Sequence, residues 1–106
     1  MKLGIILYSN DEETIWNALR LGNFALDMKD EVDIFLIGKG VEIESFDSPR
    51  FEVSEQLKTF VEGGGKVFAC GTCLELRKLE APRSSKVATL KELYEIIRGS
   101  DKVIAF

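Results

Sequence analysis

Two cysteines three residues apart are the side chains of this sequence best suited to chemistry. They frame the tetrapeptide Cys70-Gly71-Thr72-Cys73, which follows an apolar segment and precedes a segment of helical character. Unpaired backbone N–H groups and the helix dipole at such a junction favour negative charge, so we expect the pKa of Cys70 to be lowered there. Its thiolate could attack a disulfide, a sulfane sulfur or an electrophile. Gly71 and Thr72 turn the chain between the thiols and are candidate binding residues.

The sequence leaves the role of Cys73 open. At helical spacing its sulfur could reach Cys70, as in Cys-x-x-Cys redox motifs, and could resolve a persulfide or a mixed disulfide there. Alternatively, Cys73 is a core residue in the first helical turn, and Cys70 is a small buried hydrophobe. The intervening Gly-Thr differs from the Gly-Pro of thioredoxins. Cys70 and Cys73 are the candidate catalytic residues.

The rest of the composition removes several classes of chemistry. The 106 residues include no histidine, so a Cys–His or Ser–His pair within one chain is impossible. Two cysteines without histidine cannot by themselves fill a four-ligand zinc site, and the acidic residues lack metal-loop spacing, so no metal is expected; a metal shared across a symmetric oligomer is the alternative. No nucleotide-phosphate loop follows an apolar segment, and no cofactor is predicted.

Charge and hydropathy restrict the partners. The net charge of −4 gives no general attraction for phosphate backbones or anionic membranes, so we expect neither a nucleic acid nor a membrane partner. No apolar run approaches the roughly 18 residues that span a bilayer, and the segment 1–8 is too short for a signal-peptide core. We expect one cytoplasmic domain over residues 1–106, with reduced thiols.

Apolar segments alternate with helical periodicity along the chain. We expect a first helix that Ser9 or Asn10 caps and that runs to about Met28, a surface loop over 41–51, and a short helix from Cys73 to Leu79. A capping box at Thr89 opens the last helix. The alternation predicts an α/β fold with a mostly parallel five-stranded sheet and helices on both faces. The expected strands cover residues 3–8, 32–37, 66–70, 86–88 and 102–106.

Sites in open parallel sheets form at the carboxyl ends of the strands. The expected ends here carry Ser9-Asn10, Gly38-Lys39-Gly40 and the two cysteines, and Ala88-Thr89 is a fourth candidate. Ser9 and Asn10 could cap a helix or line a pocket. The glycine pair could form a plain turn or leave room for a bound group that Lys39 would anchor as an anion.

Two further features concern neighbours. Arg77 could stabilise the thiolate of Cys70 if the helix or a neighbouring subunit brings it near. Trp16, Phe24 and Met28 widen the apolar surface of the first helix, which predicts contacts beyond its own sheet and a homo-oligomer.

With these segments in place, the chain resembles the DsrE/DsrF-like family, which includes the TusD-type sulfur-relay proteins. The resemblance is carried by the opening strand into Ser9-Asn10-Asp11, by Gly38-Lys39-Gly40-Val41, by the run from Glu62 to Cys73 with Arg77 after it, and by the final strand Val103-Ile104-Ala105-Phe106. The Gly-Lys-Val-x-x-Cys pattern that ends at Cys70 is its most specific part.

The resemblance implies a three-layer α/β/α fold of the DsrEFH-like type and assembly into dimers, trimers or hexamers. Sulfur-carrying members hold a persulfide on one cysteine at the end of this strand, and that position matches Cys70. Cys73 has no counterpart in that motif. The resulting hypothesis is a sulfur carrier between a donor protein and an acceptor protein. Its alternatives are a Cys70/Cys73 dithiol redox protein and a non-catalytic subunit with structural cysteines.

Overall fold

Strands and helices alternate throughout the computed structural model, which describes residues 1–45 and 47–106. The 3-10 helix η1 follows the second strand, and the other helices are α-helices. The elements in chain order are β1 (Lys2–Leu7), α1 (Glu12–Asp27), β2 (Glu31–Leu36), η1 (Gly38–Ser45), α2 (Val53–Glu62), β3 (Lys66–Cys70), α3 (Gly71–Arg77), β4 (Lys86–Ala88), α4 (Leu90–Gly99) and β5 (Lys102–Ala105).

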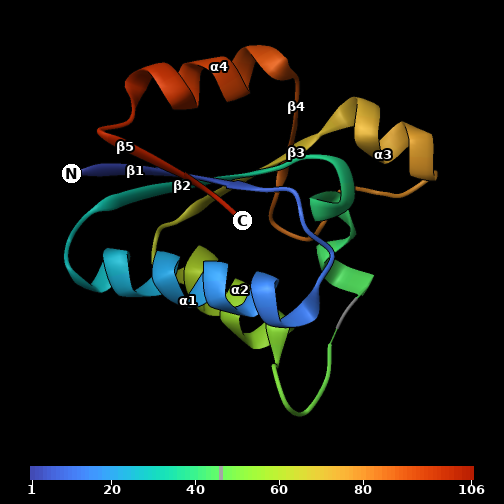
Figure 1. Cartoon of the computed structure of the whole chain (residues 1–106), viewed down its shortest axis with the longest axis horizontal. Coiled ribbons are helices and arrows are strands. Elements are labelled where there is room, and N and C mark those ends of the chain that lie inside the picture. Colours follow the sequence, from blue (N-terminus) through green and yellow to red (C-terminus); the bar gives the residue numbers. More distant parts are fainter. Residues whose placement is uncertain (46) are drawn as a thin grey trace.

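The described strands form one five-stranded sheet in the order β4-β3-β2-β1-β5. Every pairing is parallel, so the sheet is wholly rather than mostly parallel. Figure 1 shows α1 and α2 on one face of the sheet and α3 and α4 on the other. This confirms the three-layer α/β/α prediction. Because parallel strands share one direction, the segments that follow β1, β2 and β3 lie along the same edge.

The core lies on both faces of the central strands. Five of the six residues of β2 are buried, as expected for a strand covered by helices on both sides. Phe35 of β2 and Phe60 of α2 are among the largest fully buried side chains. Asp33 is the exception to the apolar run, and its carboxylate lies 3.8 Å from the Lys2 ammonium on neighbouring β1. This packing holds the carboxyl ends of β2 and β3 in fixed register.

The start of α1 differs from the prediction. Asp11, and not Ser9 or Asn10, is the N-cap, and its carboxylate accepts a hydrogen bond from the Thr14 backbone N–H at 3.0 Å. The Ser9 hydroxyl instead accepts from the Asp11 N–H at 2.9 Å. Ser9 thus forms a local turn before the helix, which frees the Asp11 side chain for capping. The capping box at Thr89 is confirmed.

Two segments predicted as irregular are helical. The expected loop over 41–51 begins as part of η1, because Val41 and Ile43 are buried and draw this stretch onto the core; Phe46 of that range lies outside the described residues. The expected turn at Gly71 and Thr72 is also wrong. Helix α3 starts directly at Gly71, with Cys70 in extended conformation as its N-cap residue.

Some of the apolar side chains of α1 that were expected to contact a partner pack within the chain instead. Trp16 and Leu26 pack against the core, and the Trp16 ring lies 5.4 Å from the Phe51 ring that precedes α2. Phe24 and Met28 stay exposed, at 64% and 62%. The apolar surface of α1 that is free to contact a partner is therefore smaller than the sequence predicted, because Trp16 does not contribute to it.

Gly40 fixes η1 against the end of β1. Its N–H donates to the Ile37 carbonyl at 3.0 Å, and the Ile37 N–H donates to the Leu7 carbonyl at 3.1 Å. A Cβ atom at Gly40 would collide with the Leu7 carbonyl, so only glycine permits this approach. The Gly38-Lys39-Gly40 segment is thus packed at Gly40 and does not leave room there for a bound group.

We predict opposite effects for alanine at two glycines. Gly40→Ala should lower the free energy of unfolding by about 1–3 kcal/mol, because the new methyl group overpacks the junction of η1 and β1. Gly99→Ala, where a Cβ would meet open space at the end of α4, should raise it by up to about 1 kcal/mol. Urea unfolding of both variants checks this, and a Gly40→Ala protein as stable as wild type would contradict the packing argument.

Candidate functional site

The two thiols face each other at the junction of β3 and α3. Cys70 is the last residue of β3, Cys73 lies in the first turn of α3, and their Sγ atoms are 3.0 Å apart. Both cysteines are free. Cys70 is only 5% exposed, whereas Cys73 is half-buried. Cys73 is thus the more accessible thiol, although the sequence singled out Cys70.

The segment after β2 completes the surroundings of the thiols. The Gly38 backbone N–H donates to the Cys73 Sγ at 3.2 Å. Gly38 has φ +56, a conformation that glycine adopts without strain. The predicted meeting of Gly38 and the cysteines at one sheet edge is therefore confirmed. The bond joins the segment after β2 to the first turn of α3.

The predicted lowering of the Cys70 pKa is wrong. Burial raises the pKa of the Cys70 thiol, and the neighbouring Cys73 side chain raises it further. The backbone amides of Cys73 and Thr72 act in the opposite direction, as the sequence argument expected, but they do not outweigh burial. The sequence could not show how deeply the end of β3 lies in the core.

A polar cluster joins three of the segments at this edge. Arg77 donates from Nε to Glu42 Oε2 at 2.8 Å and from Nη1 to the Cys73 carbonyl at 3.2 Å. The Asn10 amide donates to Glu42 Oε1 at 3.5 Å. The bond from Arg77, with smaller contributions from Asn10 and the Lys39 charge, holds the pKa of the Glu42 carboxyl below its usual range. Arg77 therefore pairs with Glu42 and positions the Cys73 backbone, and no bond to Cys70 is formed.

Glu42 is the site residue that sequence reasoning missed. Its place in an apparent loop hid it, because its pairing with Arg77 joins positions 35 residues apart. The remaining predicted binding residues make no side-chain contact with the thiols. Ser9 serves the turn before α1, Lys39 and Thr72 are exposed, and Gly71 begins α3 against the side chain of Val87.

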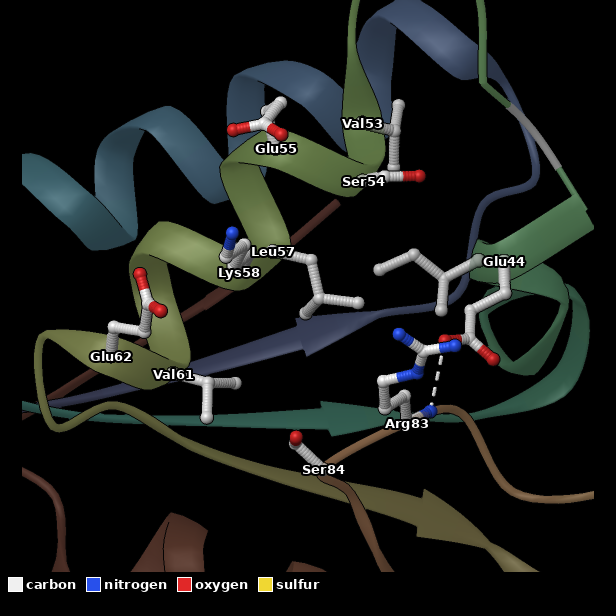
Figure 2. A pocket seen from close by; sticks show the side chains of 11 residues that line it. Glu44, Val53, Ser54, Glu55, Leu57, Lys58, Val61, Glu62, Arg83 and Ser84 are labelled. Atoms are coloured by element: carbon white, nitrogen blue, oxygen red, sulfur yellow. Dashed lines mark hydrogen bonds between the residues drawn. The ribbon is translucent and has the colours of Figure 1, made fainter.

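A cavity lies elsewhere, between α2, η1 and the segment before β4. It measures about 660 Å³, and Figure 2 shows its lining side chains with the Arg83 backbone N–H bonded to Glu44 at 2.9 Å. Its floor is apolar, with Ile43, Leu57 and Val61, and its rim is charged. Neither cysteine lines this cavity. The cavity and the thiol pair are therefore separate features of the surface.

Metal and membrane features are absent from the part of the chain that the structure describes. Residues 1–45 and 47–106 contain no group of three or more His, Cys, Asp or Glu side chains placed to hold a metal ion. Within the same ranges, no helix has the length and hydropathy to cross a bilayer.

The fold and this edge define a small parallel α/β protein with a vicinal thiol pair after its third strand. The chain belongs to the DsrE/DsrF-like family, whose model matches residues 1–106. This confirms the resemblance drawn from the sequence. Uncharacterized proteins of Methanocaldococcus jannaschii and Methanopyrus kandleri are 34% and 35% identical to it over 101 residues; the alignments cover 90% of this chain and 89% and 84% of theirs.

Solved structures agree on the fold. The crystal structure of the ychN protein from E. coli has a TM-score of 0.84 with 21% identity over 100% of both chains. A protein of unknown function from Methanobacterium thermoautotrophicum has a TM-score of 0.75 with 13% identity, over 97% of both chains. At these identities the likeness establishes the architecture and leaves the chemistry to the residues themselves.

We predict that removing the Cys73 thiol lowers the pKa of Cys70. In Cys73→Ala the raising contributions of the neighbouring side chain disappear, whereas the backbone amides that stabilise the Cys70 thiolate remain. The alkylation rate of Cys70, followed against pH by mass spectrometry of its peptide, should therefore rise at a lower pH than in wild type. An unchanged midpoint would show that the neighbouring thiol does not affect the pKa of Cys70, and a higher midpoint would show that it lowers this pKa; either result contradicts the prediction.

Proposed function

We propose that this protein is a sulfur carrier that holds sulfane sulfur as a persulfide on Cys70. The Cys70 thiolate attacks the outer sulfur of a donor persulfide and forms a new S–S bond. The donor's own S–S bond breaks, and the donor leaves as a thiolate that takes up a proton. An acceptor thiolate then removes the outer sulfur by the same exchange.

The observation that carries this proposal is the position of Cys70 at the carboxyl end of β3, in a chain of the DsrE/DsrF-like family. The backbone amides of Thr72 and Cys73 offer hydrogen bonds to a negative sulfur at this position. Free cysteines suit the cytoplasm, where thiols stay reduced, and we propose that compartment. Because Cys70 is almost buried, the partner must approach across Cys73 and present its sulfur on an exposed, projecting group.

We expect Cys70 to take up one sulfur atom. Cys73→Ser, incubated with glutathione persulfide and freed of reagent, should gain the mass of one sulfur, because Cys70 is then the remaining thiol. Dithiothreitol should remove it. The matched control is the double variant Cys70→Ser/Cys73→Ser, which should gain nothing. Intact-protein mass spectrometry gives both results.

Failure of Cys73→Ser to gain sulfur at any donor concentration would exclude the carrier function. Native-state thiol labelling that becomes fast only on unfolding would then identify both cysteines as structural.

A dithiol–disulfide redox protein is the second candidate, and the 3.0 Å separation of the two Sγ atoms favours it. Its mark would be a reversible intramolecular disulfide with a defined reduction potential and no uptake of sulfur by either single-cysteine variant.

We also propose that the chain forms a homo-oligomer through the α4 face. Leu90, Tyr94 and Ile97 recur at helical spacing and are 65%, 62% and 45% exposed, and Val87 of edge strand β4 is 64% exposed. Single exposed apolar side chains are common, but a helical row of them beside an exposed valine on an edge strand indicates an interaction surface.

Matched charge substitutions locate the interface. Tyr94→Asp should shift the sedimentation coefficient of the protein to that of a smaller species, because a buried carboxylate opposes association. Phe24→Asp, at an equally exposed position of α1, should leave the assembly unchanged. Dissociation by Phe24→Asp alone would place the interface on α1, and a monomeric wild-type protein would exclude self-association.

A further inference from the structure

We infer that Cys73 releases the sulfane sulfur of a Cys70 persulfide as hydrogen sulfide and closes a disulfide with Cys70. The inference rests on the proposed function, because it requires sulfur on Cys70. It assigns Cys73 a direct part in the reaction, and it gives the carrier a second product when no acceptor is bound.

The geometry brings the two sulfurs to the point of reaction. Their Sγ atoms are 3.0 Å apart, and a disulfide bond of about 2.05 Å needs an approach of only about 1 Å. Both thiols lie on one rigid junction, the end of β3 and the first turn of α3. No loop closure or subunit rearrangement is required.

Other contacts hold Cys73 in this place. The Gly38 N–H donates to its Sγ at 3.2 Å and stabilises the negative charge that an attacking thiolate carries. Arg77, held by Glu42, donates to the Cys73 carbonyl at 3.2 Å. Cys73 is therefore fixed from both its side chain and its backbone.

The reaction balances without an external oxidant. Cys70-S-SH and Cys73-SH give Cys70-S-S-Cys73 and hydrogen sulfide. The Cys73 thiolate attacks the inner sulfur, the Sγ of Cys70, so that the Sγ–Sγ bond forms and the bond to the outer sulfur breaks. The outer sulfur leaves with the bonding electrons as hydrosulfide and takes the proton of Cys73. The sulfane sulfur is reduced to sulfide, and the two thiol sulfurs are oxidised to a disulfide.

The choice between the two sulfurs of the persulfide follows from their leaving groups. Attack on the outer sulfur would expel the Cys70 thiolate, whose pKa burial raises, and a thiolate of high pKa leaves slowly. Attack on the inner sulfur expels hydrosulfide, which is the weaker base. The 3.0 Å contact also joins Cys73 to the inner sulfur. Release therefore competes well with a hop of sulfur from Cys70 to Cys73.

Glutathione persulfide tests the inference in a single turnover. Wild-type protein mixed with one equivalent should release about one sulfide per chain, trapped with monobromobimane, and its mass should fall by two hydrogens. Cys73→Ser should keep the added sulfur and release no sulfide above the donor blank. Cys70→Ser should form no intramolecular disulfide. Diamide provides a second measurement, because it should close the same disulfide in wild type and in neither single variant.

The outcomes separate the inference from the function on which it rests. A wild-type protein that keeps a stable persulfide without sulfide, that carries glutathione in a mixed disulfide, or that diamide cannot close overturns the inference and leaves the carrier function standing. A Cys73→Ser variant that takes up no sulfur removes the carrier function itself.

Discussion

The parallel pairing of β3 with β2 is the constraint on which the site depends. Its register places Leu36 beside Ala69, so that the segment after β2 emerges next to Cys70 and the start of α3. Gly38 then reaches Cys73, and Glu42 reaches Arg77, without a long excursion of the chain. A shift of this register would separate Gly38 from Cys73 and Glu42 from Arg77.

Burial and reactivity oppose each other at Cys70. The thiol is packed as a core residue at the end of a central strand, which raises its pKa and reduces its share of thiolate. The amides of the first turn of α3 act against this cost. Cys73 adds a second sulfur at a more accessible position, and the pair therefore has one buried and one half-buried thiol.

Exposed apolar side chains occur on both helical layers, and those on α4 lie beside an edge strand. In the layer of α1 and α2 the Trp16 ring packs near the Phe51 ring, whereas Phe24 and Met28 stay exposed. The layer of α3 and α4 leaves Tyr94 and Leu90 exposed beside β4. This is the layer into which α3 carries Cys73, so an assembly through α4 would form close to the thiol-bearing helix.

The sequence by itself determined the order of the strands and α-helices, the parallel α/β class, the family and the thiol pair at the end of β3. The elements follow from local hydrophobic periodicity, and the thiol pair follows from the three-residue spacing of the cysteines; both are properties of neighbouring residues in the sequence. Tertiary structure decided the burial of Cys70, the bond from Gly38 to Cys73 and the pairing of Glu42 with Arg77. The two bonds each join residues 35 positions apart, and burial depends on packing from other layers, so neither could be read from neighbouring residues.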